Sequence, residues 1–436
     1  MEYIKYIIFA FFVLFAIVLS ELPLSAYNAD FTPEISVREE YSDNIYLEED
    51  NTKSDYITTI SPGFLFEVIG KKRRLELSYN PGFSYYKNNP QSDSIRHRFS
   101  IFGADELTKN TTLEISDWFL RTEDPVDEDL LEEGDSTVRE NREPYSINIA
   151  TIGINHRFKE LNQFSLEYTN RILENDDEIY ADSMRHSLLS SLDYWFDSKF
   201  GFETEISYTM GRIDEFFEHD ESDDFNNISG RIRLIRSFNR QFQGFIQYAH
   251  TVMNYEDTLT DSVDYQIYDP SIGVNYAFSE DSFIAISIGY FIQDRKDRSD
   301  ESGVSVSGDL GKTWTLKRGS INCTGTSGYN ETYFGAENLG FDVFYQLRST
   351  AEYEITKHLQ SNLSFMYRED KYVNRTPERK DIRTRAGTGF TYTPKRWLSV
   401  RFNYLYSVVD STIDASDYEE NRMSIMCSLS PLRSNR

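Results

Sequence analysis

The chain has 436 residues, a formal net charge of −27 and only two cysteines, Cys323 and Cys427. The acidic balance argues against nucleic acid as a partner, because nucleic-acid binding needs a basic surface. Two cysteines so far apart exclude a disulfide framework and a cysteine-based metal site. The 30 tyrosines and 31 phenylalanines are instead typical of outer-membrane β-barrels, whose aromatic girdles mark both bilayer interfaces.

The N-terminal segment has the layout of a secretory signal peptide. Lys5 precedes an unbroken apolar stretch over residues 7–19, and small residues follow up to Ala26. This stretch is shorter than the roughly 20 residues that a spanning helix needs. We predict cleavage after Ala26, with Ser20 as second choice, so that residues 1–26 are the signal peptide. An uncleaved N-terminal anchor is the alternative interpretation.

Apolar and polar residues then alternate with a period of two. The apolar face of residues 74–85 consists of Leu75, Leu77, Tyr79, Pro81, Phe83 and Tyr85. The pattern returns at residues 95–101, 200–208 and 398–406. Successive side chains of a strand point to opposite sides, so each segment has one apolar and one polar face.

The connections between these segments alternate between short and long. The nine short ones lie at residues 70–72, 107–110, 159–162, 197–199, 239–240, 279–281, 317–319, 356–358 and 394–396. The ten long ones are acidic and begin at residues 47–55, with the longest at residues 122–144. Short periplasmic turns and long outer loops are the arrangement of a bacterial outer-membrane barrel, and this count predicts about 20 strands (18–20).

A barrel in lipid fits these segments better than a soluble all-β fold. The segments run about ten to thirteen residues, enough to cross a bilayer when tilted, whereas sandwich strands are usually shorter. Closing the sheet also removes the edges that lipid cannot satisfy by hydrogen bonding. We therefore predict an antiparallel up-and-down transmembrane β-barrel over residues 27–436, as a single domain without a separate plug.

The start of the mature chain resembles a known family. Residues 34–47 include Tyr41, Asp43, Asn44, Ile45 and Tyr46, and a Pro-Gly pair follows at residues 62–63. The segment is similar to the opening of the outer-membrane β-barrel porins found beside exosortase (PEP-CTERM type) and capsular or exopolysaccharide loci. The motifs cover about forty residues, and the hairpin pattern matches over the whole mature chain.

The resemblance implies a location in the outer membrane of a Gram-negative bacterium and a role linked to surface polysaccharide or exported protein. It also implies polysaccharide-export components as partners, beside the lipid and lipopolysaccharide of the membrane. One departure is the C-terminus, because many such barrels end on an aromatic residue, whereas this chain ends at Arg436. Either residues 423–429 form the last strand before a short tail, or the assembly signal is weaker.

Charged residues on the polar faces are distributed unevenly. The early strands carry acidic residues that we expect to line the pore, namely Glu76, Glu114, Glu167, Glu203 and Glu205. The last strands and one early strand carry an expected basic wall, made of Arg96, Arg98, Arg368, Arg383, Arg385, Arg401 and Arg422. Porin constrictions select solutes with charged walls of this kind. The alternative is that these side chains are merely solvated or paired with one another, and Arg231 and Arg233 break the segregation.

The longest loop, at residues 122–144, is the third outer loop. Its acidic residues include Asp124, Asp127, Glu128, Asp129, Glu132 and Glu133. A solvated loop explains them, but the loop could also fold inward as a constriction or bind Ca²⁺, which prefers oxygen ligands. Together, the acidic outer loops could bridge through divalent ions to lipopolysaccharide.

No catalytic motif is visible. None of the six histidines lies in a Ser/His or Asp/His pattern that would activate a nucleophile. Asp43 and Asn44 are better explained by an Asx-type turn. We therefore expect no enzyme activity, no cofactor and no metal, and predict a porin-like pore or export conduit. The alternative is a non-conducting structural or docking barrel of an envelope assembly.

Overall fold

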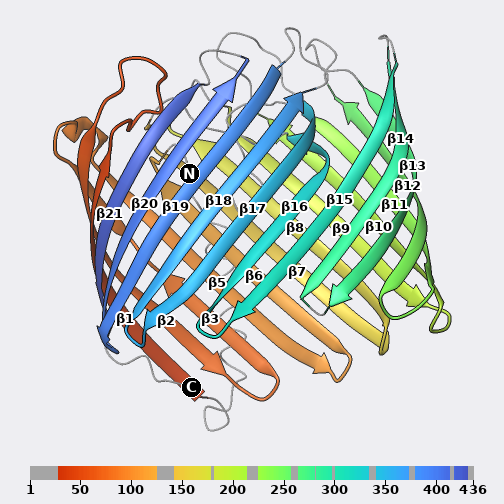
Figure 1. Cartoon of the computed structure of the whole chain (residues 1–436), viewed down its shortest axis with the longest axis horizontal. Coiled ribbons are helices and arrows are strands. Elements are labelled where there is room, and N and C mark those ends of the chain that lie inside the picture. The colour runs from red at the N-terminus through yellow and green to blue at the C-terminus, as the bar shows by residue number, and fades with distance from the viewer. Residues whose placement is uncertain are drawn as a thin grey trace.

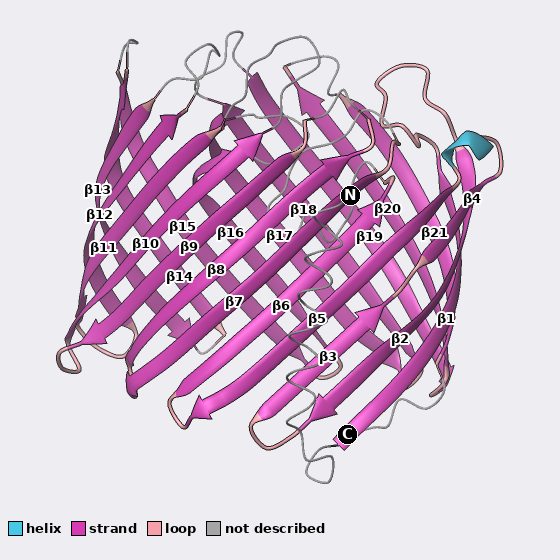
Figure 2. Ribbon diagram, turned by 180° about the vertical axis from the view of Figure 1, so that it is seen from behind, coloured by secondary structure: helices cyan, strands magenta, loops and turns pink. Residues whose placement is uncertain are grey.

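The computed structural model describes residues 28–124, 142–177, 181–213, 224–256, 264–279, 281–296, 300–332, 340–372, 379–412 and 417–430. These residues form a closed antiparallel β-barrel of 20 strands, seen from two sides in Figures 1 and 2. No helix in these ranges is long and apolar enough to cross a membrane. The predicted signal peptide at residues 1–26 lies outside the described residues.

The elements follow one another around the barrel in chain order. Their bounds are β1 (Asn28–Ser42), β2 (Asp55–Ile69), β3 (Arg73–Tyr79), β4 (Gly82–Tyr86), η2 (Pro90–Ser92), β5 (Ser94–Thr108), β6 (Thr111–Thr122), β7 (Tyr145–Lys159), β8 (Asn162–Asn175), β9 (Ser183–Trp195), β10 (Phe200–Ile213), β11 (Phe225–Ser237), β12 (Phe242–Tyr255), β13 (Tyr265–Ser279), β14 (Ser282–Arg295), β15 (Glu301–Leu316), β16 (Gly319–Thr332), β17 (Gly340–Thr356), β18 (Leu359–Tyr372), β19 (Arg379–Lys395), β20 (Leu398–Ser411) and β21 (Tyr418–Leu429). Apart from β3 and β4 the strands have 12 to 17 residues, which is longer than expected, because pairing continues into residues that the sequence assigned to loops.

The predicted strand at residues 74–85 is divided. Both β3 and β4 pair with β2 on one side and with β5 on the other, so together they occupy one position in the barrel. The division falls at Asn80 and Pro81, because proline has no N–H to donate to a neighbouring strand. The expectation of one continuous strand was wrong here, whereas the count of about 20 strands is confirmed.

The register gives the barrel two distinct faces. Large apolar side chains exposed on one face recur in successive strands, as in Ile246, Ile272, Ile288, Val306, Leu347 and Leu363. Each residue paired with one of these belongs to the same face, and the residues between belong to the other. The apolar face is therefore the outer, lipid-facing surface, and the polar face lines the lumen.

The nine short connections all fall where the sequence placed them. Side chains close some of these turns: the Asp197 carboxylate accepts the backbone N–H groups of Lys199 at 2.7 Å and Phe200 at 2.9 Å. Aromatic rings gather beside the turns, with the ring centroids of Tyr194 and Phe196 5.3 Å apart. This is the girdle that the aromatic composition suggested for one bilayer interface.

The barrel closes where β1 pairs with β21, along Ile35–Ser42 and Arg422–Leu429. The residues of the family-like segment lie at the outer end of this seam. Buried Asn44 donates its side-chain N–H groups to the carbonyl oxygens of Glu48 at 2.7 Å and Glu419 at 3.0 Å. Its Oδ1 accepts the Glu48 N–H at 3.1 Å, and the neighbouring Asp43 carboxylate accepts the backbone N–H of Asn421 at 2.7 Å. These two side chains tie the loop after β1 to the last strand.

Replacing Asn44 with alanine is expected to destabilise the barrel by about 2 kcal/mol, because it removes three hydrogen bonds of a buried side chain that join the loop after β1 to the last strand. The measurement is the thermal unfolding of the refolded barrel in detergent, followed by circular dichroism. Asn226→Ala is the matched control, since its amide bonds partly exposed side chains near the rim. Equal stability of N44A and N226A would contradict a structural role for Asn44.

Candidate functional site: the barrel lumen

The register places all twelve charged residues expected to line the pore on the inner face. In the strand register, Arg368 lies opposite Arg383, and Arg385 lies opposite Ser407. These inner-face rows alternate with lipid-facing rows. Arg96 and Arg98 belong to the inner row of β5, and Arg422 lies opposite Ser42. Whether these residues line a conducting pore stays a prediction.

The acidic residues are partly neutralised by basic neighbours on the next strand or the same one. Glu203 is 3.2 Å from Arg233, and Glu205 is 3.0 Å from Arg231, so the two arginines that broke the predicted segregation are their partners. Glu76 pairs with Arg74. For Glu114 and Glu167, no ion pair joins them to any residue in the described part of the chain. The net field of this wall is therefore weaker than the sequence suggested.

Part of the basic wall is a buried ladder on β18 and β19. The Asp370 carboxylate accepts from Arg368 at 2.7 Å and from Arg383 at 2.7 Å. Asp381 accepts from Arg379 at 3.0 Å and from Arg383 at 3.3 Å. All five side chains are buried on the lumen side. Their desolvation is compensated by these paired, charge-assisted bonds, so they are structural.

The sequence analysis missed the aspartates of this ladder. Arg368 and Asp370 are two residues apart, and so are Arg379, Asp381 and Arg383 in turn. Residues two apart in a strand share a face. An alternating Arg-x-Asp pattern is therefore the signal that would have identified a self-paired ladder.

A second charged group, here the seam cluster, joins the seam to both ends of the third outer loop. It contains the inner-face residues Arg38, Glu40, Arg96, Glu420 and Arg422, and the loop residues Glu123, Asp124 and Arg142. Arg96 contacts the Glu123 carboxylate at 2.5 Å, and Arg422 lies 3.4 Å from Asp124. The four arginines and four carboxylates balance in charge.

Arg142 connects this cluster to the first outer loop. Its side chain donates to the backbone carbonyl of Ile45 and, at 2.9 Å, to the Tyr86 hydroxyl. Tyr86 in turn donates to Glu123 at 2.8 Å. Both ends of the third loop are therefore held inside the rim of the barrel. Asp124 is part of this buried cluster, while Asp127, Glu128, Asp129, Glu132 and Glu133 lie outside the described residues.

Apolar side chains also face inward near the long-loop end. Ile213, Phe225, Met253, Tyr265 and Ile267 form a buried cluster on β10 to β13. Val343, near the outer end of β17, packs against it from another part of the wall. The inner wall of β10 to β13 is thus apolar toward this end.

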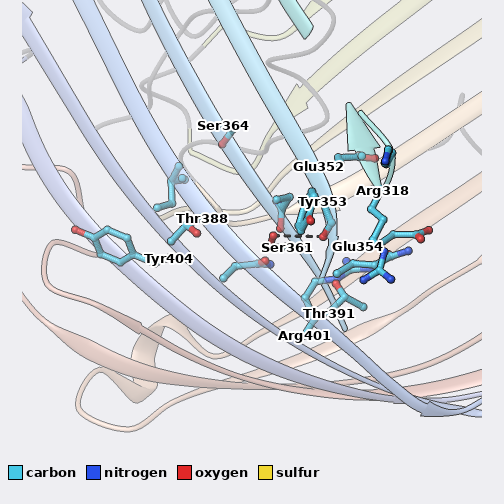
Figure 3. A pocket seen from close by; sticks show the side chains of 17 residues that line it. Arg318, Glu352, Tyr353, Glu354, Ser361, Ser364, Thr388, Thr391, Arg401 and Tyr404 are labelled. Atoms are coloured by element: carbon cyan, nitrogen blue, oxygen red, sulfur yellow. Dashed lines mark hydrogen bonds between the residues drawn. The ribbon is translucent and has the colours of Figure 1, made fainter. Parts of the chain in front are cut away.

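The inner wall of β17 to β20 borders a larger space. A cavity of about 690 Å³ is lined by Ser364, Gly387, Asn362, Thr391 and Arg401, among others (Figure 3). A second cavity of about 350 Å³ lies under the seam cluster and is lined by Arg38, Arg96, Arg98 and Arg422. For Arg385 and Arg401, no hydrogen bond or ion pair joins the guanidinium to another described residue. Some arginines of the predicted basic wall therefore form ion pairs, whereas Arg385 and Arg401 form none with the described residues.

The pKa values of the loop carboxylates are low despite their burial. Burial alone would raise the pKa of Glu123. The Arg96 guanidinium has the opposite and larger effect, so the pKa lies below its ordinary value. For Asp124, burial is likewise outweighed by Arg422 and Arg142, so its pKa is well below the usual range. A group with a lowered folded-state pKa stabilises the structure above its unfolded pKa and loses that contribution as pH falls through the folded value.

Glu123→Gln is therefore expected to lower stability by about 3 kcal/mol at neutral pH, because Arg96 is left buried without its counter-ion. The difference from the native chain should stay constant between pH 8 and 5 and shrink only below about pH 4. Thermal unfolding over this pH range measures it. Glu205→Gln, in a half-exposed pair, should change stability by less than about 1 kcal/mol. A difference between E123Q and the native chain that already vanishes at pH 6 would contradict the assignment.

Comparisons with known proteins agree with this architecture. A sequence model of the family described as "Putative beta-barrel porin 2" matches residues 203–429. No curated protein matches the chain in sequence.

Among solved structures, the siderophore receptor PirA from Pseudomonas aeruginosa superposes with a TM-score of 0.52 at 9% identity, over 92% of this chain and 80% of that chain. The ferric enterobactin receptor PfeA from the same organism gives 0.49 at 9% identity, over 93% and 81%. OpdO, also from Pseudomonas aeruginosa, gives 0.42 at 11% identity, over 92% and 98%. The similarity to PirA shows a shared barrel fold. Because the family model covers more than half of the 436 residues, the chain belongs to the Putative beta-barrel porin 2 family.

Proposed function

We propose that this porin-like barrel lies in the outer membrane of a Gram-negative bacterium and is a passive conduit for hydrophilic solutes. The observation that carries the proposal is the polar inner wall of β17 to β20, where serine, asparagine and glycine, together with charged residues such as Glu352 and Arg401, border a cavity of about 690 Å³. Small, hydrogen-bonding side chains leave room for water and for polar solutes. A barrel of about this strand number is wide enough for an aqueous lumen.

The inward-held ends of the third loop support a constriction near the outer mouth. Glu123, Asp124 and Arg142 occupy space inside the rim and are bonded to the wall. In such a pore they narrow the path at the end that faces the cell exterior.

The finer part of the proposal is a link to the export of surface polysaccharide. It rests on the resemblance of the segment that ends β1, including Asp43 and Asn44, to barrels encoded beside exopolysaccharide loci. Export components would meet the barrel at its periplasmic turns, and lipopolysaccharide would meet its acidic outer loops.

A non-conducting docking barrel is the second candidate. It is favoured by the apolar cluster around Phe225 and Met253 and by its contact with Val343, because an apolar inner wall is unfavourable for the passage of hydrated solutes. The two candidates differ in whether the purified barrel passes ions.

The test is the single-channel conductance of the refolded barrel in a planar lipid bilayer. A conduit gives stepwise currents, and the double variant E123Q/D124N, which weakens the loop attachment, is expected to raise the unit conductance about twofold or more, because a narrow constriction dominates the resistance. E205Q/R231Q, which removes a neutral pair from the wall, should leave the conductance near that of the native chain. A folded barrel that passes no current, with or without the loop attachment, would overturn the conduit and favour the docking role.

A further inference from the structure

Two inner-face arginines stand out because, like Arg401, they have no anionic partner among the described residues, and because they lie in one row across β17 to β19. They are Arg348 of β17, which the sequence analysis did not single out, and Arg385 of β19. No hydrogen bond or ion pair joins either guanidinium to a residue in the described ranges. Arg231, Arg233, Arg368, Arg383 and Arg422, by contrast, each contact a carboxylate.

The register brings the two arginines into the same row. Arg348 pairs with Met366 of β18, and Met366 pairs with Arg385. Neighbouring strands are about 4.8 Å apart, so the two Cα atoms are separated by roughly 10 Å. Both side chains leave the sheet on the lumen side, and each is long enough for the two guanidinium groups to meet over Met366. The pair can therefore act on one ligand.

On the outer side, carboxylates of β18 and β19 are already bonded to arginines. The buried ladder begins one inner-face row away, at Arg368 and Arg383, where Asp370 accepts from both arginines and Asp381 accepts from Arg383. In the same row as Arg385, Glu420 is already bonded to Arg422 and to the Ser42 hydroxyl. A ligand between Arg348 and Arg385 thus lies beside two guanidinium groups that no described carboxylate pairs with, while Glu352 and Glu354 of β17 line the cavity farther toward the periplasmic turns.

The next inner-face row on the periplasmic side carries only small side chains near the pair. Gly387 follows Arg385 on the same face, and Ser364 lies directly opposite it. A Cβ atom at Gly387 would clash with the Ser364 hydroxyl at 2.6 Å, so the glycine leaves room for that hydroxyl against the wall. Both residues line the cavity of about 690 Å³ drawn in Figure 3, so a solute in that cavity can reach the arginine pair.

We infer that Arg348 and Arg385 form a binding site for an anionic group, a carboxylate or phosphate carried by the solute. Each guanidinium offers several N–H donors in a planar fork that fits the oxygens of these groups. This inference rests on the proposed conduit and names the class of solute that it conducts. The arginines set the preference for anions, and Ser364 and Asn362 contact the uncharged part of the solute.

The test is equilibrium binding of inorganic phosphate and of glucuronate to the purified full-length barrel in detergent, measured by calorimetry. R348A/R385A is expected to weaken binding of at least one of these anions by about tenfold or more, because two charge-assisted contacts are lost. R348K/R385K, which keeps the charge but not the fork, should give an intermediate affinity. E205Q/R231Q, with a charge-neutral change elsewhere in the lumen, should bind as the native chain does.

Thermal unfolding shows whether each variant is folded, and the lysine variant provides the comparison if the alanine variant is not. Equal affinity of the native chain and the folded variants, or no binding of either anion, would overturn the site. Reversal potentials in a salt gradient then separate this inference from the conduit. If the barrel binds anions through these arginines but passes no current, the anion site is supported and the conduit is contradicted. If the barrel conducts but its anion binding and anion preference do not change in R348A/R385A, the conduit is supported and the site is contradicted.

Discussion

The structure depends on one constraint, that a sheet surrounded by hydrocarbon must satisfy every backbone N–H and C=O group within itself. The only solution for strands is closure, and closure requires the first and last strands to find each other across the whole chain. Ile35–Ser42 pair with Arg422–Leu429, a shorter ladder than the one that joins all of β1 to β2. Side chains compensate at the outer end of this seam, where Asp43, Asn44 and the seam cluster bind the two strands together.

Closure fixes the two faces of every strand, and the faces decide what each charge can do. A charged residue on the inner face contacts side chains directly opposite it on the neighbouring strands. It also contacts the residues two positions before and after it on its own strand. Where a carboxylate stands there, as with Asp370 beside Arg383, the charge is used within the wall. Where the neighbour is a methionine or a glycine, as around Arg385, no described carboxylate pairs with the charge. The same register thus divides the inner-face charges into paired and unpaired ones.

Much of the fold could be predicted from the sequence because it is encoded locally. Period-two alternation and turn residues such as Asp197 act within a few positions of one another, and all nine short turns were located correctly. The break at Pro81 was missed because the alternation of apolar residues continues through it. The inner-face position of Arg385 and Arg401 followed from parity alone. The pairing of Glu123 with Arg96, or of Arg142 with the Ile45 carbonyl, could not be foreseen, since it depends on how a loop returns into the lumen. Arg348 was not predicted because it lies on β17, one strand before those to which the C-terminal part of the basic wall was assigned.

The seam cluster has a consequence for how the barrel is assembled. Its balance of charge is complete only when β1, both ends of the third outer loop and β21 are all in place, with Arg422 supplied by the last strand of the chain. A chain that closed early, before the third hairpin had delivered Asp124, would trap Arg422 in the wall with less negative charge around it. Such a ring would be less stable than the complete one and would tend to reopen. The cluster therefore stabilises the closed cylinder most when all of these segments are present together.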